Sequence, residues 1–144
     1  MEFINIFGLI FTFALMIPNI IYALKCKGGF ENKWNNKIIE VTEQIGRFGS
    51  IAFMIINIPG TYFGWWSDEA LAIYLIGDTI LTILYCVLWF ILFNKSNLFR
   101  ALSLSIIPSI LFLFSGTMSR SVPLIFFSIL FSFGHIVISY KNAK

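Results

Sequence analysis

Residues 70–93 read ALAIYLIGDTILTILYCVLWFILF, an apolar run in which Asp78 is the single charged side chain. A bilayer core about 30 Å thick is crossed by a helix of about 20 apolar residues, so this run predicts a transmembrane helix. A soluble domain of 144 residues could not bury a chain that is 58% hydrophobic. Lipid is therefore the expected surrounding of this protein.

Four further runs resemble the first in length and composition. We therefore expect an all-α integral membrane protein, a bundle of five transmembrane helices forming one domain over residues 1–144. The predicted spans are residues 3–24, 46–66, 70–93, 98–118 and 122–140, and residues 25–45 form the longest loop. The first run is expected to be retained rather than cleaved, because Met1 and Glu2 supply no basic residue and Lys25 and Lys27 follow the run.

The basic residues are concentrated in alternate loops, and this asymmetry predicts the orientation. With the N-terminus outside and the C-terminus inside, nine of the ten Lys and Arg residues fall on the cytoplasmic side, and Arg120 alone falls outside. The bias toward Phe, Ile, Asn and Lys is typical of proteins from AT-rich bacteria. The expected location is therefore the cytoplasmic membrane of a bacterium.

Residues 36–48 stand apart from the rest of the cytoplasmic loop. Ile38, Val41, Ile45 and Phe48 recur at helical spacing. This pattern fits either a helix lying in the membrane interface or an inward extension of the second span. The nearby lysines are expected to attract anionic membrane lipids.

Each span places its small and polar residues at steps of three and four, which puts them on one face of a helix. Such faces favour either close packing between helices or a polar cavity shared by them. Gly60 and Gly64 fit the small-xxx-small motif of close packing. The five faces are Gly8, Thr12, Asn19 and Tyr22; Gly46, Ser50, Asn57, Gly60 and Gly64; Tyr74, Asp78, Thr82, Tyr85 and Trp89; Ser105, Ser109 and Gly116; and Ser128, Ser132, His135 and Ser139.

Two titratable residues lie within the predicted spans. An ionised Asp78 near mid-membrane would cost about 2.5 kcal/mol or more, so such residues usually have a partner or a function. Its partner could be a neighbouring hydrogen-bonding side chain, or Arg120 if the loop after the fourth span folds inward. His135, the only histidine, is either a packing residue or a group that relays protons near neutral pH.

Asn19, Glu43 and Arg47 are predicted near the same inner side as His135, where together they could line a cytoplasmic vestibule. The alternative is that Glu43 and Arg47 form a simple surface pair at i and i+4. Prolines 18, 59 and 108 interrupt three spans, and Pro59 beside Asn57 predicts an irregular segment that could bind a ligand. The candidate ligand-binding or proton-binding residues are thus Asp78, His135, Asn57, Asn19, Glu43, Arg47 and Tyr85.

Several functional classes lack their signatures in this chain. One histidine and two separated cysteines argue against a metal site, and no P-loop, Rossmann fingerprint or G-x-S-x-G motif is present. No cofactor is expected. The basic residues do not cluster as a phosphate footprint requires, so no nucleic-acid partner is expected either.

Three functions remain open. The leading hypothesis is that the protein binds or translocates a small solute, coupled to protons, as a homodimer or with a partner membrane subunit. The second is a non-catalytic membrane subunit, scaffold or sensor. The third, a membrane-embedded lipid-modifying enzyme that uses Asp78, Glu43 or His135 as acid or base, has the least support, so the sequence leans against an enzyme.

Overall fold

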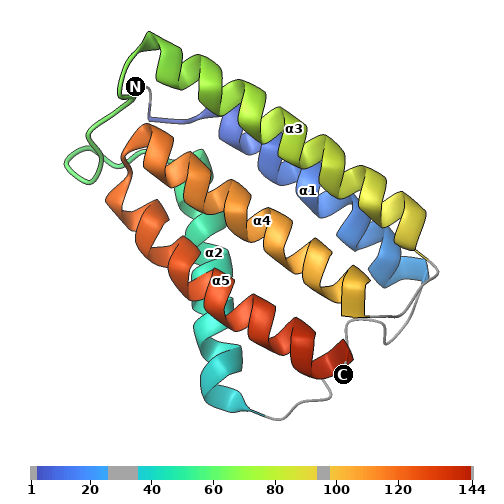
Figure 1. Cartoon of the computed structure of the whole chain (residues 1–144). Helices are drawn as coiled ribbons and strands as arrows, with labels where there is room; N and C mark the ends of the chain where they lie inside the picture. The colour runs from blue at the N-terminus through green and yellow to red at the C-terminus, as the bar shows by residue number, and fades with distance from the viewer. Residues whose placement is uncertain (1–2, 26–35, 94–97, 144) are drawn as a thin grey trace.

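The computed structural model describes residues 3–25, 36–93 and 98–143, and these residues form five α-helices (Figure 1). The helices are α1 (Ile6–Lys25), α2 (Lys37–Ile55), α3 (Asp68–Leu92), α4 (Leu98–Ser119) and α5 (Val122–Ala143). The described ranges contain two isolated bridges but no strand. The predicted helical bundle is confirmed, and α1, α3, α4 and α5 are each long and apolar enough to cross a membrane.

The second helix differs from its prediction. Residues 46–66 do not form one helix, because α2 begins at Lys37, inside the predicted loop 25–45, and ends at Ile55. Its start is fixed by Asn36, whose side chain accepts a hydrogen bond from the Ile39 N–H at 3.2 Å. Its end precedes Pro59, which disfavours helical backbone at and before its own position. Residues 37–48 are helical, as both interpretations of this stretch require.

Residues 56–67 form the irregular segment that Pro59 predicted, and other parts of the chain satisfy its backbone. The Asn57 N–H donates to the Phe3 carbonyl at 2.7 Å, and the Phe63 N–H donates to the Arg120 carbonyl at 3.0 Å. Gly60 and Gly64 adopt φ angles of +89° and +86°, which favour glycine, and a methyl group at either would meet no neighbour. The interpretation of these two glycines as a helix-packing motif is therefore wrong.

Arg120 holds this segment against the turn between α4 and α5. Its guanidinium donates to the carbonyls of Gly64 at 2.8 Å and Phe63 at 3.0 Å, and it lies 4.8 Å from the centre of a Trp66 ring. The suggested pairing of Arg120 with Asp78 is thus not observed, because the arginine is committed to backbone carbonyls.

The five helices form a closed ring in the order α1, α3, α4, α5, α2. Figure 1 shows four of them running side by side along one direction, while α2 crosses them obliquely. Helices α1 and α3 are parallel, as the successive pairs Asn19–Tyr85 and Tyr22–Trp89 show. Helix α1 contacts α2 near its own first turn, where Gly8 lies against the Met54 backbone and the Asn5 N–H donates to the Ile55 carbonyl. We call this the N-terminal end of the bundle and the opposite one, where α5 ends, the C-terminal end.

The predicted polar faces of the four long helices point into the bundle. On α3, Tyr74, Asp78, Thr82, Tyr85 and Trp89 are all buried, whereas Phe90 on the opposite face is 87% exposed. Ser67 caps α3 as the sequence indicates, accepting a hydrogen bond from the Ala70 N–H at 3.1 Å. An apolar exterior around a polar interior is the arrangement that lipid favours.

The contact between α2 and α5 supplies a test of this packing. A methyl group at Gly46 would overlap the backbone of Phe131, whereas one at Gly77 would meet only the movable ring of Phe114. Gly46→Ala should therefore destabilise the fold by about 1–3 kcal/mol, although alanine is the better helix former. Unfolding of the purified protein in detergent would measure this, with Gly77→Ala as the matched control. Equal stability of both variants would contradict the packing described.

Candidate functional site

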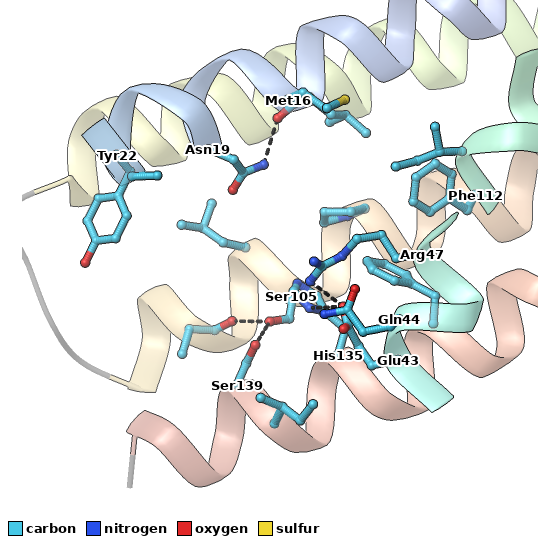
Figure 2. Close-up of a pocket in the computed structure, with 18 of the residues that line it drawn as sticks. Met16, Asn19, Tyr22, Glu43, Gln44, Arg47, Ser105, Phe112, His135 and Ser139 are labelled. Carbon is cyan, nitrogen blue, oxygen red and sulfur yellow. Dashed lines mark hydrogen bonds and ion pairs between the residues drawn. The ribbon is translucent and has the colours of Figure 1, made fainter. Parts of the chain in front are cut away.

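A cavity of about 1040 Å³ lies in the C-terminal half of the bundle (Figure 2). All five helices contribute to its wall, because the oblique α2 meets α1 at the N-terminal end and diverges from it toward the other. We call it the C-terminal cavity. Its polar wall residues include Asn19, Glu43, Gln44, Arg47, Tyr85, Ser105, His135 and Ser139, and its apolar ones include Leu15, Ile51, Phe112 and Phe131.

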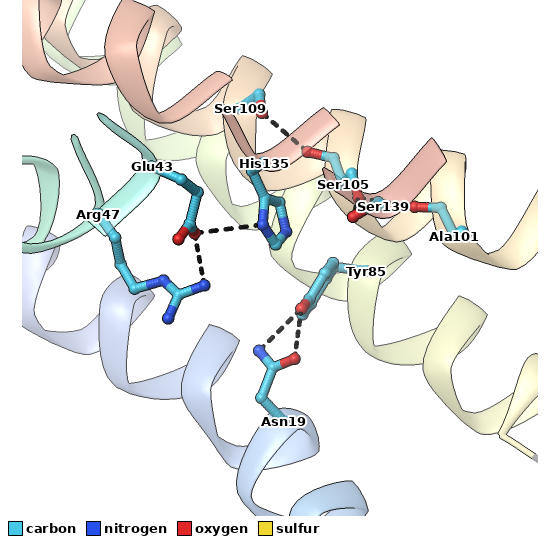
Figure 3. Close-up of polar contacts among 9 residues, drawn as sticks. All are labelled: Asn19, Glu43, Arg47, Tyr85, Ala101, Ser105, Ser109, His135 and Ser139. Carbon is cyan, nitrogen blue, oxygen red and sulfur yellow. Dashed lines mark hydrogen bonds and ion pairs between the residues drawn. The ribbon is translucent and has the colours of Figure 1, made fainter. Parts of the chain in front are cut away.

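Glu43 is the centre of the charged part of the wall (Figure 3). Its carboxylate Oε1 lies 2.5 Å from Nη2 of Arg47 and 3.4 Å from Nδ1 of His135. Glu43 is only 3% exposed, so the alternative of a simple surface pair is wrong. Gly134 explains the approach, because any side chain there would collide with the Glu43 backbone. The close contact of α2 and α5 thus brings His135 to the carboxylate that already pairs with Arg47 on the same helix.

Two neutral pairs face the same space. The Asn19 amide and the Tyr85 hydroxyl hydrogen-bond each other, at 2.8 Å from Nδ2 to Oη and 3.0 Å from Oη to Oδ1. Ser105 on α4 donates to Ser139 on α5 at 2.5 Å. These pairs fix side chains from α1, α3, α4 and α5 around the cavity, as Figure 3 shows. Amides and hydroxyls of this kind can hydrogen-bond a polar ligand from several sides.

Cationic groups outnumber carboxylates on the cavity wall. Lys37, Arg47 and Arg100 line it together with Glu40 and Glu43, and His135 lines it beside them. Arg100 is held at the rim by its contacts with aromatic rings: its guanidinium carbon lies 5.1 Å from the centre of the Tyr22 ring and 5.9 Å from that of Trp89. The local charge therefore favours a ligand that carries an anionic group.

Two of the sequence candidates lie elsewhere. Asp78 is fully buried, accepts a hydrogen bond from Ser115 at 2.5 Å through Oδ2, and does not line the C-terminal cavity. Asn57 borders a separate space of about 380 Å³ at the N-terminal end, beside Asn5 and Trp65. The structure thus brings together Asn19, Glu43, Arg47, Tyr85 and His135 and separates Asp78 and Asn57 from them.

Sequence reasoning missed Arg100 and Gln44 as cavity residues. A signal existed for Arg100, since it lies within the predicted fourth span, where a charge usually has a partner. For Gln44 there was none, because its position on the inner wall depends on how α2 is rotated.

Comparison with protein-family models, curated proteins and solved structures gives no match to this chain. The chemistry of the site is therefore argued from its own geometry. Within the described ranges, no group of three or more His, Cys, Asp or Glu side chains is placed to hold a metal ion.

Removing the central carboxylate should destabilise the fold. Glu43→Gln keeps the shape of the side chain but leaves Arg47 without its counter-charge and His135 without its carboxylate neighbour. We expect a loss of about 1–2 kcal/mol, less than for a fully buried pair because the Arg47 side chain is 40% exposed. Detergent unfolding would measure it. The control is Glu69→Gln on the exposed first turn of α3, which should lose no more than about 0.5 kcal/mol, and equal losses would contradict a central role for Glu43.

Proposed function

We propose that this chain is a small membrane protein that binds a small organic solute in the C-terminal cavity, as a step in its translocation. The observation that carries the proposal is the cavity itself, with its charged and hydrogen-bonding wall. Its volume of about 1040 Å³ suits a small organic molecule, since ligand sites commonly measure about 300–1000 Å³. A bundle that served packing alone would have no need of such a space.

The wall chemistry indicates the class of solute. Arg47 uses one guanidinium nitrogen on Glu43, and a guanidinium has five N–H donors in a geometry that matches carboxylates. Amide and hydroxyl groups stand opposite, and Leu15, Ile51 and Phe112 supply an apolar floor. We infer a solute that has a carboxylate and a short apolar or polar body, such as an amino acid or a hydroxy acid.

The direction of the helices supports five crossings of the membrane. Helices α1 and α3 are parallel, so the chain between them must return from one end of the bundle to the other. Helix α2 carries charges in its first three turns, and in this proposal it crosses as a half-polar helix continued by residues 56–67. Irregular backbone at membrane depth is tolerated where protein covers it, and discontinuous helices of this kind often surround transporter sites.

The proposed orientation places the cavity mouth in the cytoplasm of a bacterial cell. The basic residues Lys25, Lys37, Arg100 and Lys141 belong to the C-terminal end, which the positive-inside rule assigns to the cytoplasm. In this proposal the contact between α1 and α2 closes the N-terminal end, and His135 beside Glu43, rather than the separate Asp78, is the proton-coupling group. A second copy or a partner subunit would complete the wall on the lipid side.

Binding can be tested with the tryptophan of the cavity wall, Trp89. Glutamate, glycine, lactate and choline would be titrated into protein in lipid nanodiscs while intrinsic fluorescence and thermal stability are followed. We expect at least one carboxylate, and not choline, to bind. Arg47→Gln should weaken that binding about tenfold or more, which corresponds to about 1.4 kcal/mol.

Lys141→Gln is the matched control, because this lysine lies near the same end of the bundle without lining the cavity. Its affinity should equal that of the wild type. Binding that is indifferent to Arg47→Gln would contradict the proposed site. Turnover of labelled phospholipids that His135→Gln abolishes would instead favour the lipid-modifying enzyme.

A further inference from the structure

Each of the five helices contributes one hydroxyl or carboxyl group to a single level near the middle of the bundle. We call this level the polar layer; its members are Thr12, Ser50, Asp78, Ser115 and Ser128, none more than 3% exposed. The hydrogen bond from Ser115 to Asp78 joins α4 to α3 at this level. Gly8 lies against Met54, and one turn further along these antiparallel helices Thr12 comes opposite Ser50.

The other contacts agree with this register. On α4 and α5, the pairs Gly116–Ile125 and Phe112–Phe131 lie on either side of Ser115 and Ser128. Between α1 and α3, the ring of Phe11, next to Thr12, contacts Tyr74, one turn before Asp78. The polar layer is therefore fixed by packing on every side.

Four oxygen atoms at this level and one turn below it have no hydrogen-bond partner among the residues that the structure describes. They are Thr12 Oγ1, Ser50 Oγ, Asp78 Oδ1 and Thr82 Oγ1. The layer's serines on α4 and α5 do have partners, since Ser115 contacts the Leu111 carbonyl and Ser128 the Ile125 carbonyl. The unpartnered oxygens are thus confined to α1, α2 and α3. A buried polar atom without a partner costs about 1–3 kcal/mol, so four in one region indicate something to which they bind.

We propose that the polar layer binds one sodium ion through Asp78 Oδ1 and the hydroxyl oxygens of Thr12, Ser50 and Thr82. An all-oxygen donor set suits a hard cation and offers no soft ligand to a transition metal. One carboxylate balances one positive charge, whereas a divalent ion would leave an uncompensated charge in a medium of low dielectric constant. Membrane transporters commonly hold their coupling cation near the bilayer midplane in this way.

The structure also gives the ion a route. Thr12 belongs both to the polar layer and to the wall of the C-terminal cavity, so the cation enters from that cavity. None of the charged residues that would hold the solute, Glu43, Arg47 and Arg100, belongs to the layer. The sodium site therefore stands independently of the solute site, and failure of one leaves the other intact.

Thermal unfolding in lipid nanodiscs, without added solute, tests the proposal. Sodium, potassium and choline chloride would be compared at equal ionic strength and pH. A ligand that binds only the folded state stabilises it by mass action, so we expect a saturable rise of the unfolding temperature with sodium. Potassium should need a half-saturating concentration about tenfold or more above that of sodium. Choline should have no effect. Asp78→Asn should abolish the shift, and Thr12→Val should raise the half-saturating concentration.

The matched control is Thr117→Val, the same substitution at an exposed position on α4. It should respond to sodium as the wild type does. Should Asp78→Asn fail to fold, infrared difference spectra of the wild type with sodium and with choline address the same carboxyl group, with Thr82→Val as the variant that weakens the response. A carboxylate band that sodium perturbs supports the site. A protonated carboxyl band indifferent to sodium, or equal stabilisation by the three salts, overturns it.

Discussion

The parallel arrangement of α1 and α3 is the constraint on which the rest of the structure depends. Because both helices run from the N-terminal to the C-terminal end, the chain between them has to come back, and α2 provides most of the return. Its regular part stops at Ile55, and residues 56–67 complete the path with a backbone held by residues 3–5 and by Arg120. The oblique course of α2 follows from its contact with α1 at only one end, and the C-terminal cavity is the space that this course leaves.

The same geometry sorts the polar groups into two regions. The charged first half of α2 faces the cavity, where Glu43 meets His135 because Gly134 allows α2 and α5 to approach. At the polar layer the ring of helices is closed, and the layer consists of small hydroxyls and Asp78. Asp78 has no charged partner among the described residues. In our proposal the first region binds an organic solute and the second a sodium ion. Thr12 connects the two.

Much of this fold could be predicted from sequence because lipid allows so few solutions. The lengths of the apolar runs gave four of the helices to within a few residues, and steps of three and four gave their inward faces. The end of α2 was missed because residues 56–66 contain no charged side chain to interrupt the apolar run, although Pro59 and the two glycines gave a warning. The positions of Asp78 and Asn57 depended on helix register and on where α2 ends, which one sequence does not reveal. Asn19, Glu43, Arg47 and His135 were expected on one side because depth along each helix follows from residue count, and all four line the C-terminal cavity.

The central proposal is that water reaches the C-terminal cavity from the cytoplasmic side of the membrane and not from the opposite side. Single cysteines at Ser139 in the cavity and at Ser128 in the polar layer, each in a chain whose Cys26 and Cys86 are replaced by serine, would be exposed to a membrane-impermeant maleimide. Right-side-out and inverted vesicles would be compared. The account predicts that Ser139→Cys reacts only in inverted vesicles and that Ser128→Cys reacts in neither. Reaction of Ser139→Cys in right-side-out vesicles, or its silence in both, would contradict the account.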